Sequence, residues 1–235
     1  MNNLYILKLG GSLVVPTWNK FDEGYLGRLK HTLELYIEKG MQFVIIVGGG
    51  KICRWYQDEG RRLMITDNED LNWIGAYVTR VNAEVVNSFF KPLSHERSYY
   101  DFDQPIKLTK PILVVGAWKP GKSTNMDAVL MAEKFSSRTI INLSDIDHVY
   151  DKDPKKYPEA KPLDYLTWSE YERIVGHRIT AGQRVHQAGD NLPFDVIATQ
   201  KAKEDGLKVI FAHGQDLPNF QKVLEGEVFS GTTIE

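Results

Sequence analysis

Residues 112–133, ILVVGAWKPGKSTNMDAVLMAE, contain an apolar strand-like run, a glycine-rich basic loop and a helix-like run. A loop of this kind brings together backbone N–H groups, a lysine and a helix N-terminus, all of which attract phosphate. Residues 116–123, GAWKPGKS, also satisfy the P-loop formula G-x-x-x-x-G-K-[ST]. The stretch therefore predicts an α/β protein that binds phosphate, and the surrounding sequence decides which kind.

The composition of the 235-residue chain is that of an ordinary globular protein. Its net charge is −2 and 42% of its residues are hydrophobic, so no global basic excess indicates a nucleic-acid partner. The single cysteine, Cys53, excludes an intramolecular disulfide framework and is typical of a reducing compartment. Neither a signal-peptide pattern nor an apolar run of membrane-spanning length is present. We therefore expect a cytoplasmic protein without a membrane partner.

Two further strand–loop–helix units precede the opening stretch. The apolar run 4–9 contains Lys8 and is followed by Gly10-Gly11-Ser12. A lysine in a buried strand is costly unless it meets an anion, although a lysine that reaches solvent at a sheet edge is the alternative. The run 43–47 is followed by three glycines, 48–50, which permit close backbone approach, usually to a ligand. These units predict binding loops at the carboxyl ends of parallel strands.

Hydrophobic spacing predicts the remaining elements. Helices are expected over residues 22–39, 51–63, 70–90, 124–135, 167–175, 195–205 and 217–224. Further strands are expected over residues 139–143, 207–211 and 231–235, the last at a sheet edge, with a short hairpin at 144–154 and loops at 91–111 and 155–166. The six histidines lack metal-ligand spacing, so a zinc site is not expected.

Six segments in a fixed order carry a family resemblance. They are residues 8–12 (KLGGS), 47–54 (VGGGKICR), 74–83 (IGAYVTRVNA), 144–154 (SDIDHVYDKDP), 188–195 (AGDNLPFD) and 231–234 (GTTI). Together they resemble the amino acid kinase family, and within it the uridylate (UMP) kinases of the archaeal and bacterial type. The resemblance covers almost the whole chain. It implies one domain over residues 1–235, folded as a three-layer α/β/α sandwich with an open, mainly parallel eight-stranded sheet.

The resemblance also implies a reaction and its partners. The expected reaction transfers the γ-phosphoryl group of ATP to UMP and yields UDP and ADP, a step of pyrimidine nucleotide biosynthesis. The acceptor would bind in about residues 1–135 and ATP in about residues 136–235, by resemblance to the family. Mg²⁺ would be carried with ATP, and the chain would form a homo-oligomer, a hexamer in this family.

The resemblance assigns individual residues to this reaction. The catalytic residues would be Lys8 and Ser12. The ATP site would comprise Lys8, Gly10, Gly11, Ser12, Gly50, Arg54, Ser144, Tyr150 and Asp153, with a core aromatic as the alternative role of Tyr150. The UMP site would comprise Gly49, Asn72, Trp118, Lys119, Pro120, Gly121, Lys122, Ser123 and Thr124.

Three positions depart from the family pattern. Asn72 and Asn125 stand where these kinases normally carry aspartate, and His148 stands where glycine is usual. An asparagine cannot neutralise a lysine or a metal, and Asp127 does not share a helix face with Asn125. The departures leave open a nucleotide-binding relative that no longer catalyses and acts as a sensor or storage scaffold. A P-loop NTPase is a further alternative, although it leaves the other motifs unexplained.

Overall fold

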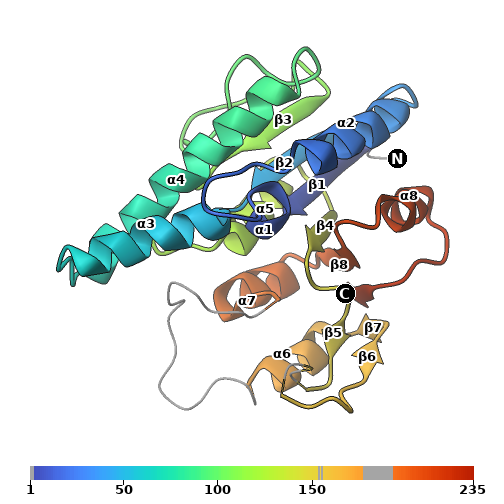
Figure 1. The fold of residues 1–235 in the computed structure, drawn as a ribbon. Coiled ribbons are helices and arrows are strands. Elements are labelled where there is room, and N and C mark those ends of the chain that lie inside the picture. Colours follow the sequence, from blue (N-terminus) through green and yellow to red (C-terminus); the bar gives the residue numbers. More distant parts are fainter. Residues whose placement is uncertain (1–2, 153, 155, 177–192) are drawn as a thin grey trace.

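A seven-stranded sheet forms the middle of the molecule in the computed structural model, which describes residues 3–152, 154, 156–176 and 193–235 (Figure 1). The strands follow one another across the sheet in the order β3 (Ile112–Val115), β2 (Gln42–Val47), β1 (Leu4–Leu9), β4 (Thr139–Ser144), β8 (Lys208–His213), β9 (Thr232–Ile234) and β7 (Tyr165–Leu166). The strands from β3 to β8 are parallel, and β9 is antiparallel to β8. A separate two-stranded sheet pairs β5 (Val149–Tyr150) with β6 (Pro162–Leu163).

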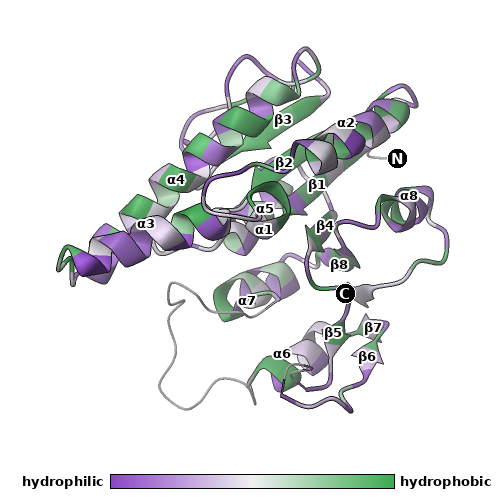
Figure 2. Ribbon diagram, viewed as in Figure 1, coloured by the Kyte–Doolittle hydropathy of each residue, from purple (hydrophilic) through white to green (hydrophobic). Residues whose placement is uncertain are grey.

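The central strands are apolar on both faces because helices cover both faces. Strand β3, for example, is buried along its whole length and is hydrophobic throughout (Figure 2). One core cluster joins the sheet to α1 (Gly11–Val14), α2 (Glu23–Ile37), α4 (Asn68–Phe89) and α8 (Leu217–Glu225). A second cluster joins the sheet to α5 (Thr124–Lys134), α6 (Trp168–Gly176) and α7 (Val196–Glu204). The predicted three-layer α/β/α architecture is therefore confirmed.

The direction in which successive strands are added to the sheet reverses at β1, and this reversal positions the site. From β1 the chain extends the sheet through β2 and β3 on one side and through β4 and β8 on the other. In open α/β sheets such a switch creates a crevice beyond the carboxyl ends of the strands. Lys8 of β1 lies in register with Ile46 of β2 and Asn142 of β4. The topology thus places Lys8 in the centre of the sheet, next to the switch point.

Helix α3 (Gly50–Arg62) follows the second glycine loop and packs beside α4 (Figure 1). The predicted helices are all present, with boundaries that differ by a few residues at most. Four of them begin at an aspartate that caps the helix. The side chains of Asp22 and Asp195, for example, accept hydrogen bonds from the backbone N–H groups of Tyr25 and Ala198. In the described part of the chain, no helix is both long and apolar enough to span a membrane.

Three expectations about the strands are wrong. The main sheet has seven strands among the described residues, where the resemblance implied eight. Strand β9 lies between β8 and β7 and not at the edge. The segment 155–166 is not only a loop, because it contains β6 and β7, and β6 supplies the partner of β5 that was predicted within residues 144–154. Two-residue strands show no hydrophobic period, so only their distant partners reveal them.

Candidate active site

The glycine loops after β1 and β2 pack against each other through their backbones. A Cβ atom at Gly11 would lie 2.0 Å from the backbone nitrogen of Gly50, and one at Gly48 would lie 2.6 Å from that of Gly11. Gly50 also has a φ of +66°, a conformation that side chains disfavour. Helix α3 begins at Gly50, so its first-turn N–H groups have no acceptor within the helix. The glycines therefore allow the two loops to meet through their backbones at the N-terminus of α3.

Helix α4 holds the second of these loops in place. The buried amide of Asn82 donates to the carbonyl oxygens of Gly48 and Gly49, at 3.2 and 2.9 Å. A Cβ atom at Gly49 would lie 3.2 Å from Oγ1 of Thr79, so the helix also approaches this loop closely. Asn82 belongs to the segment 74–83 that carried the resemblance, but the sequence did not indicate what its side chain binds.

Lys8 is a half-buried cation that two carboxylates influence electrostatically. Burial lowers its pKa from 10.5 to about 8, and the negative charges of Asp145 and Asp195 oppose this shift. The alternative in which Lys8 reaches solvent at a sheet edge is wrong, because β1 lies between β2 and β4. A lysine in this position can meet an anion at the end of the sheet. Ser12 is half-buried in the short helix α1, which begins directly after β1 and Gly10.

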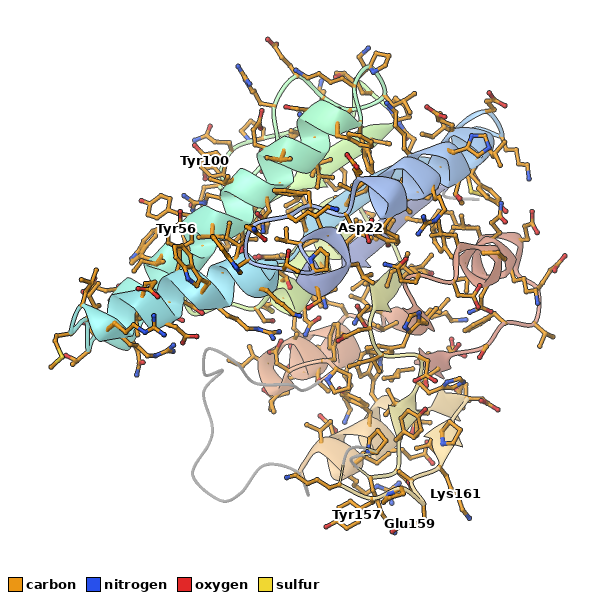
Figure 3. All side chains as sticks on the ribbon, viewed as in Figure 1. Asp22, Tyr56, Tyr100, Tyr157, Glu159 and Lys161 are labelled. Atoms are coloured by element: carbon orange, nitrogen blue, oxygen red, sulfur yellow. The ribbon has the colours of Figure 1, made fainter. Side chains whose placement is uncertain are left out.

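The loop after β3 is also fixed by α4. A Cβ atom at Gly116 would lie 2.9 Å from the Cα atom of Arg80, so only glycine permits this approach. The Arg80 guanidinium donates to the carbonyl oxygens of Ala117, at 2.9 Å, and Trp118. It also lies 4.5 Å from the ring centre of Tyr100, which is labelled beside α4 in Figure 3. Sequence reasoning did not identify Arg80 as the residue that organises this loop.

The tip of the same loop carries two lysines and approaches Asn72. The Nζ atoms of Lys119 and Lys122 lie 3.9 and 4.5 Å from the ring centre of Trp118. Gly121 has a φ of +73°, and a Cβ atom there would lie 4.0 Å from Nδ2 of Asn72. The structure thus brings Asn72 of α4 beside the loop 118–124, as the resemblance implied.

A buried polar network connects this loop to the start of α7. The Ser123 hydroxyl accepts from the backbone N–H of Met126, at 3.1 Å, and donates to the Asp195 carboxylate. The Asn125 amide donates to the same carboxylate at 3.4 Å. The other oxygen of Asp195 accepts from the backbone N–H of Ala198 at 3.1 Å. Because Asp195 is also one of the charges near the lysine of β1, the network joins the loop electrostatically to the centre of the sheet.

Asp127 is a second buried carboxyl group under the same loop. It is fully buried, and neither of its oxygens has a hydrogen-bond partner of good geometry among the described residues. Burial raises its pKa from 3.8 to about 8, while the Trp118 backbone N–H and the charges of Lys122 and Arg80 oppose the rise. Burial therefore favours the protonated form of Asp127. Asp127 lies near Trp118, Lys122 and Arg80, whereas Asn125 donates to Asp195 and Pro193, and Asp195 also acts electrostatically on Asp127.

The residues expected around the nucleoside of ATP lie in and near β4 and β5. Ser144 is buried against the first glycine loop, because a Cβ atom at Gly10 would lie 3.1 Å from its Cα atom. Tyr150 is half-buried in β5, and its hydroxyl lies 3.1 Å from the Asp147 carboxylate. Arg54 is exposed one turn into α3. Asp153 lies outside the described residues.

The geometry of residues 116–123 differs from what a P-loop requires. In a P-loop, the backbone N–H groups surround a phosphate, and the lysine and the following hydroxyl reach the phosphate and its metal. Here the Lys122 ammonium lies over the Trp118 ring, and the Ser123 hydroxyl donates to Asp195. The formula match therefore does not make this loop an ATP-binding P-loop.

A metal cage built from protein side chains is not found within residues 3–152, 154, 156–176 and 193–235. No three or more histidine, cysteine, aspartate or glutamate side chains come together there in a way that could hold a metal ion.

The chain is similar to known kinases over its whole length. The model of the amino acid kinase family matches residues 3–213. The uridylate kinase of Thermofilum pendens is 31% identical over 236 residues, which cover 99% of this chain and 97% of that protein. The uridylate kinase of Thermoplasma volcanium is 32% identical over 237 residues, which cover 100% of this chain and 99% of that protein. The crystal structure of uridylate kinase from Archaeoglobus fulgidus matches with a TM-score of 0.81 and 27% identity, over 98% of this chain and 99% of that chain.

Replacing Asp127 by asparagine should stabilise the protein increasingly as the pH rises. Since its pKa is higher in the folded than in the unfolded state, the folded protein binds more protons between about pH 4 and pH 8, and stability falls as the pH rises through this range. We expect Asp127→Asn to change the free energy of unfolding little near about pH 5 and to raise it by about 1–3 kcal/mol near about pH 8.5. Thermal unfolding at both pH values measures this.

The exposed carboxylate of Asp58, which pairs with Arg61, provides a matched control. Asp58→Asn should show no such increase between the two pH values. A gain for Asp127→Asn that does not depend on pH would contradict the raised pKa.

Proposed function

The chain belongs to the amino acid kinase family, and from this premise we propose that it transfers the γ-phosphoryl group of ATP to UMP, giving UDP and ADP. The observation that carries the proposal is the contact between the two glycine loops at the ends of β1 and β2, with Lys8 beside them in the centre of the sheet. The choice of UMP as acceptor is supported by relatives called uridylate kinase that match the chain from end to end.

The proposed mechanism depends on positioning and charge. Phosphoryl transfer needs little covalent help from a protein, but the reacting groups must be aligned and the charge on the equatorial oxygens must be neutralised. The ATP phosphates would bind at the loop 10–12 and at Gly50, close to backbone N–H groups. The Lys8 ammonium would stabilise the negative charge that develops during transfer. Mg²⁺ would arrive with ATP and be held by its phosphates.

We place UMP at Gly49, at Asn72 and along the loop 118–124, where Lys119 and Lys122 supply positive charge. The nucleoside of ATP would lie on the side of Ser144 and Tyr150, with Arg54 and Asp153 also facing ATP. The buried position of Ser144 against the first glycine loop supports this orientation. The acceptor would then bind mainly to about residues 1–135 and ATP mainly to about residues 136–235, as in the resemblance.

An exposed apolar stripe on α4 supports a homo-oligomer. Tyr77, Val81, Val85 and Phe89 follow one another at intervals of four residues and are 57%, 62%, 41% and 41% exposed. Such a stripe usually packs against another element. We propose that α4 contacts the same helix of a second subunit, within a hexamer built from dimers. We also propose a cytoplasmic location, where ATP and UMP are available.

Lys8 and Lys122 should affect different steps. With ATP, Mg²⁺ and UMP in a coupled assay of ADP release, Lys8→Met should lower kcat by about 10²–10³-fold, the effect of one lost donor to a developing charge. Lys122→Met, the same change in the acceptor loop, should mainly raise KM for UMP. If Lys122→Met abolished ATP binding while Lys8→Met left turnover intact, a P-loop function would be correct. Tight ATP binding without turnover in the unmodified protein would instead favour a scaffold.

Asn72 should discriminate weakly between ribose and deoxyribose. A neutral amide contributes a net hydrogen bond of about 1 kcal/mol, less than a carboxylate does. We therefore expect kcat/KM for UMP to exceed that for dUMP by no more than about tenfold, and Asn72→Asp to increase the ratio. A panel of nucleoside monophosphates that includes CMP measures both values. A strong preference for UMP over dUMP in the unmodified protein would contradict this role.

Charging the α4 stripe should disrupt the assembly. Val81→Lys places a cation in the middle of the stripe, and light scattering after gel filtration should then show a smaller species. The matched control is Glu69→Lys, in the first turn of the same helix and outside the stripe. An unchanged mass for Val81→Lys would rule out this face as the subunit contact.

A further inference from the structure

Asn125 makes contacts that an aspartate could not make. It lies in the first turn of α5 and is 7% exposed. Its Nδ2 atom donates to Oδ2 of Asp195 at 3.4 Å and to the carbonyl oxygen of Pro193 at 3.5 Å. An ionised carboxylate accepts hydrogen bonds only, so both contacts require the amide. Asn142 of β4, the register partner of Lys8, donates to the same carbonyl oxygen at 3.5 Å.

The acceptor of this hydrogen bond, Asp195, is held from two helices. Ser123 and Asn125 of the α5 N-terminus donate to one oxygen, and the Ala198 N–H of α7 donates to the other. Asp195 is 8% exposed, so these donors replace water around the carboxylate. The segment that carries Asp195 is also tied to the strand next to Lys8, because Asn142, the register partner of Lys8, binds the Pro193 carbonyl oxygen. Asp195 thus presents a fixed negative charge whose sign favours the protonated form of Lys8.

We propose that Asn125 is a positioning residue for phosphoryl transfer: its amide holds the Asp195 carboxylate in place, and Asp195 in turn keeps the Lys8 ammonium at the phosphate site. This inference rests on the proposed kinase function. In this role the Asn125 side chain must donate a hydrogen bond. A neutral amide can do this and an ionised carboxylate cannot, so the site depends on the amide at position 125.

The charges around Asp195 explain why a carboxylate would not serve at position 125. Lys122 and Arg80 face Asp127 on the same helix. Burial favours the neutral form of Asp127, so Asp127 adds little negative charge beside Asp195. The lysine of β1 is the cation near Asp195, and it is shared with Asp145. A carboxylate at position 125 would therefore place a second negative charge at hydrogen-bond distance from Asp195 without a cation of its own among the described residues. When two carboxylates lie at this distance, one pKa of the pair is raised and the pair retains one proton to higher pH.

The test compares pH profiles of kcat/KM for the unmodified protein and for Asn125→Asp, with ATP and UMP. In Asn125→Asp, the added carboxyl group and Asp195 share a proton at low pH. This proton must be lost before the Asp195 carboxylate regains its full negative charge beside Lys8. The acidic limb should therefore move up by at least about one pH unit, so that activity near about pH 6.5 falls about tenfold or more and recovers toward about pH 8. An unchanged profile, or higher activity at every pH, would overturn the proposal.

Two further variants separate the donor from the charge. Asn125→Ala removes the donor without adding a charge and should lower kcat, and Asn125→Ser restores a small donor and should recover part of the loss. Equal activities for the alanine and serine variants would contradict a donor role. Both variants keep the proposal testable if the aspartate variant does not fold.

Asn87 provides a matched control for the cost of placing an aspartate in the interior. It is fully buried in α4, and its amide donates to the backbone carbonyl of His95 at 3.1 Å, near the amino end of β3. Asn87→Asp should lower thermal stability and leave the pH profile unchanged. A shift of the profile equal to that of Asn125→Asp would mean that the effect is merely structural.

A second readout does not depend on turnover. If the unmodified protein failed to phosphorylate any nucleotide, the proposed function would be wrong, and the contacts of Asn125 could still be tested. In nucleotide-free protein with ¹³C-labelled aspartate carboxyl groups, Asn125→Asp should add a titration above about pH 6. An added signal that titrates entirely below about pH 5 would overturn the inference.

Discussion

The backbone contact between the first two glycine loops is the constraint on which the site depends. Strands β1 and β2 are adjacent, parallel and in register up to Leu9 and Val47, so the loops that follow them leave the sheet at the same level and meet. At their contact a Cβ atom on Gly11 would lie only 2.0 Å from the nitrogen of Gly50. Any side chain there would separate the loops, and the spacing between Lys8 and the backbone donors of α3 would be lost.

Helix α4 extends this constraint from one loop region to the other. Its Asn82 side chain binds the loop after β2, and its Arg80 side chain binds the loop after β3. Both contacts are hydrogen bonds from a side chain to loop carbonyl groups, so a rigid helix sets the distance between the loop after β2 and the loop after β3. A loop that depended on its own residues for this spacing would be less well fixed.

The buried charges are balanced in a way that favours an amide at position 125. Asp195 and Asp127 already lie in this interior, and burial is costly for each charge. Burial raises the pKa of Asp127 and so favours its neutral form, whereas Asp195 accepts hydrogen bonds from several donors, one of which is Asn125. The departure from the family pattern that raised doubt about activity thus has a physical role in this chain.

The sequence by itself determined the α/β fold and the glycine loops, because hydrophobic period and glycine runs are local signals, and it predicted a role for Lys8. Only the tertiary structure decided which residues hold the site together. The Asn125 amide meets Asp195 across 70 positions of the chain, and Arg80 meets Ala117 across 37. No local pattern encodes such contacts, since they arise only when packing brings distant segments together and removes the water that would otherwise satisfy their polar groups.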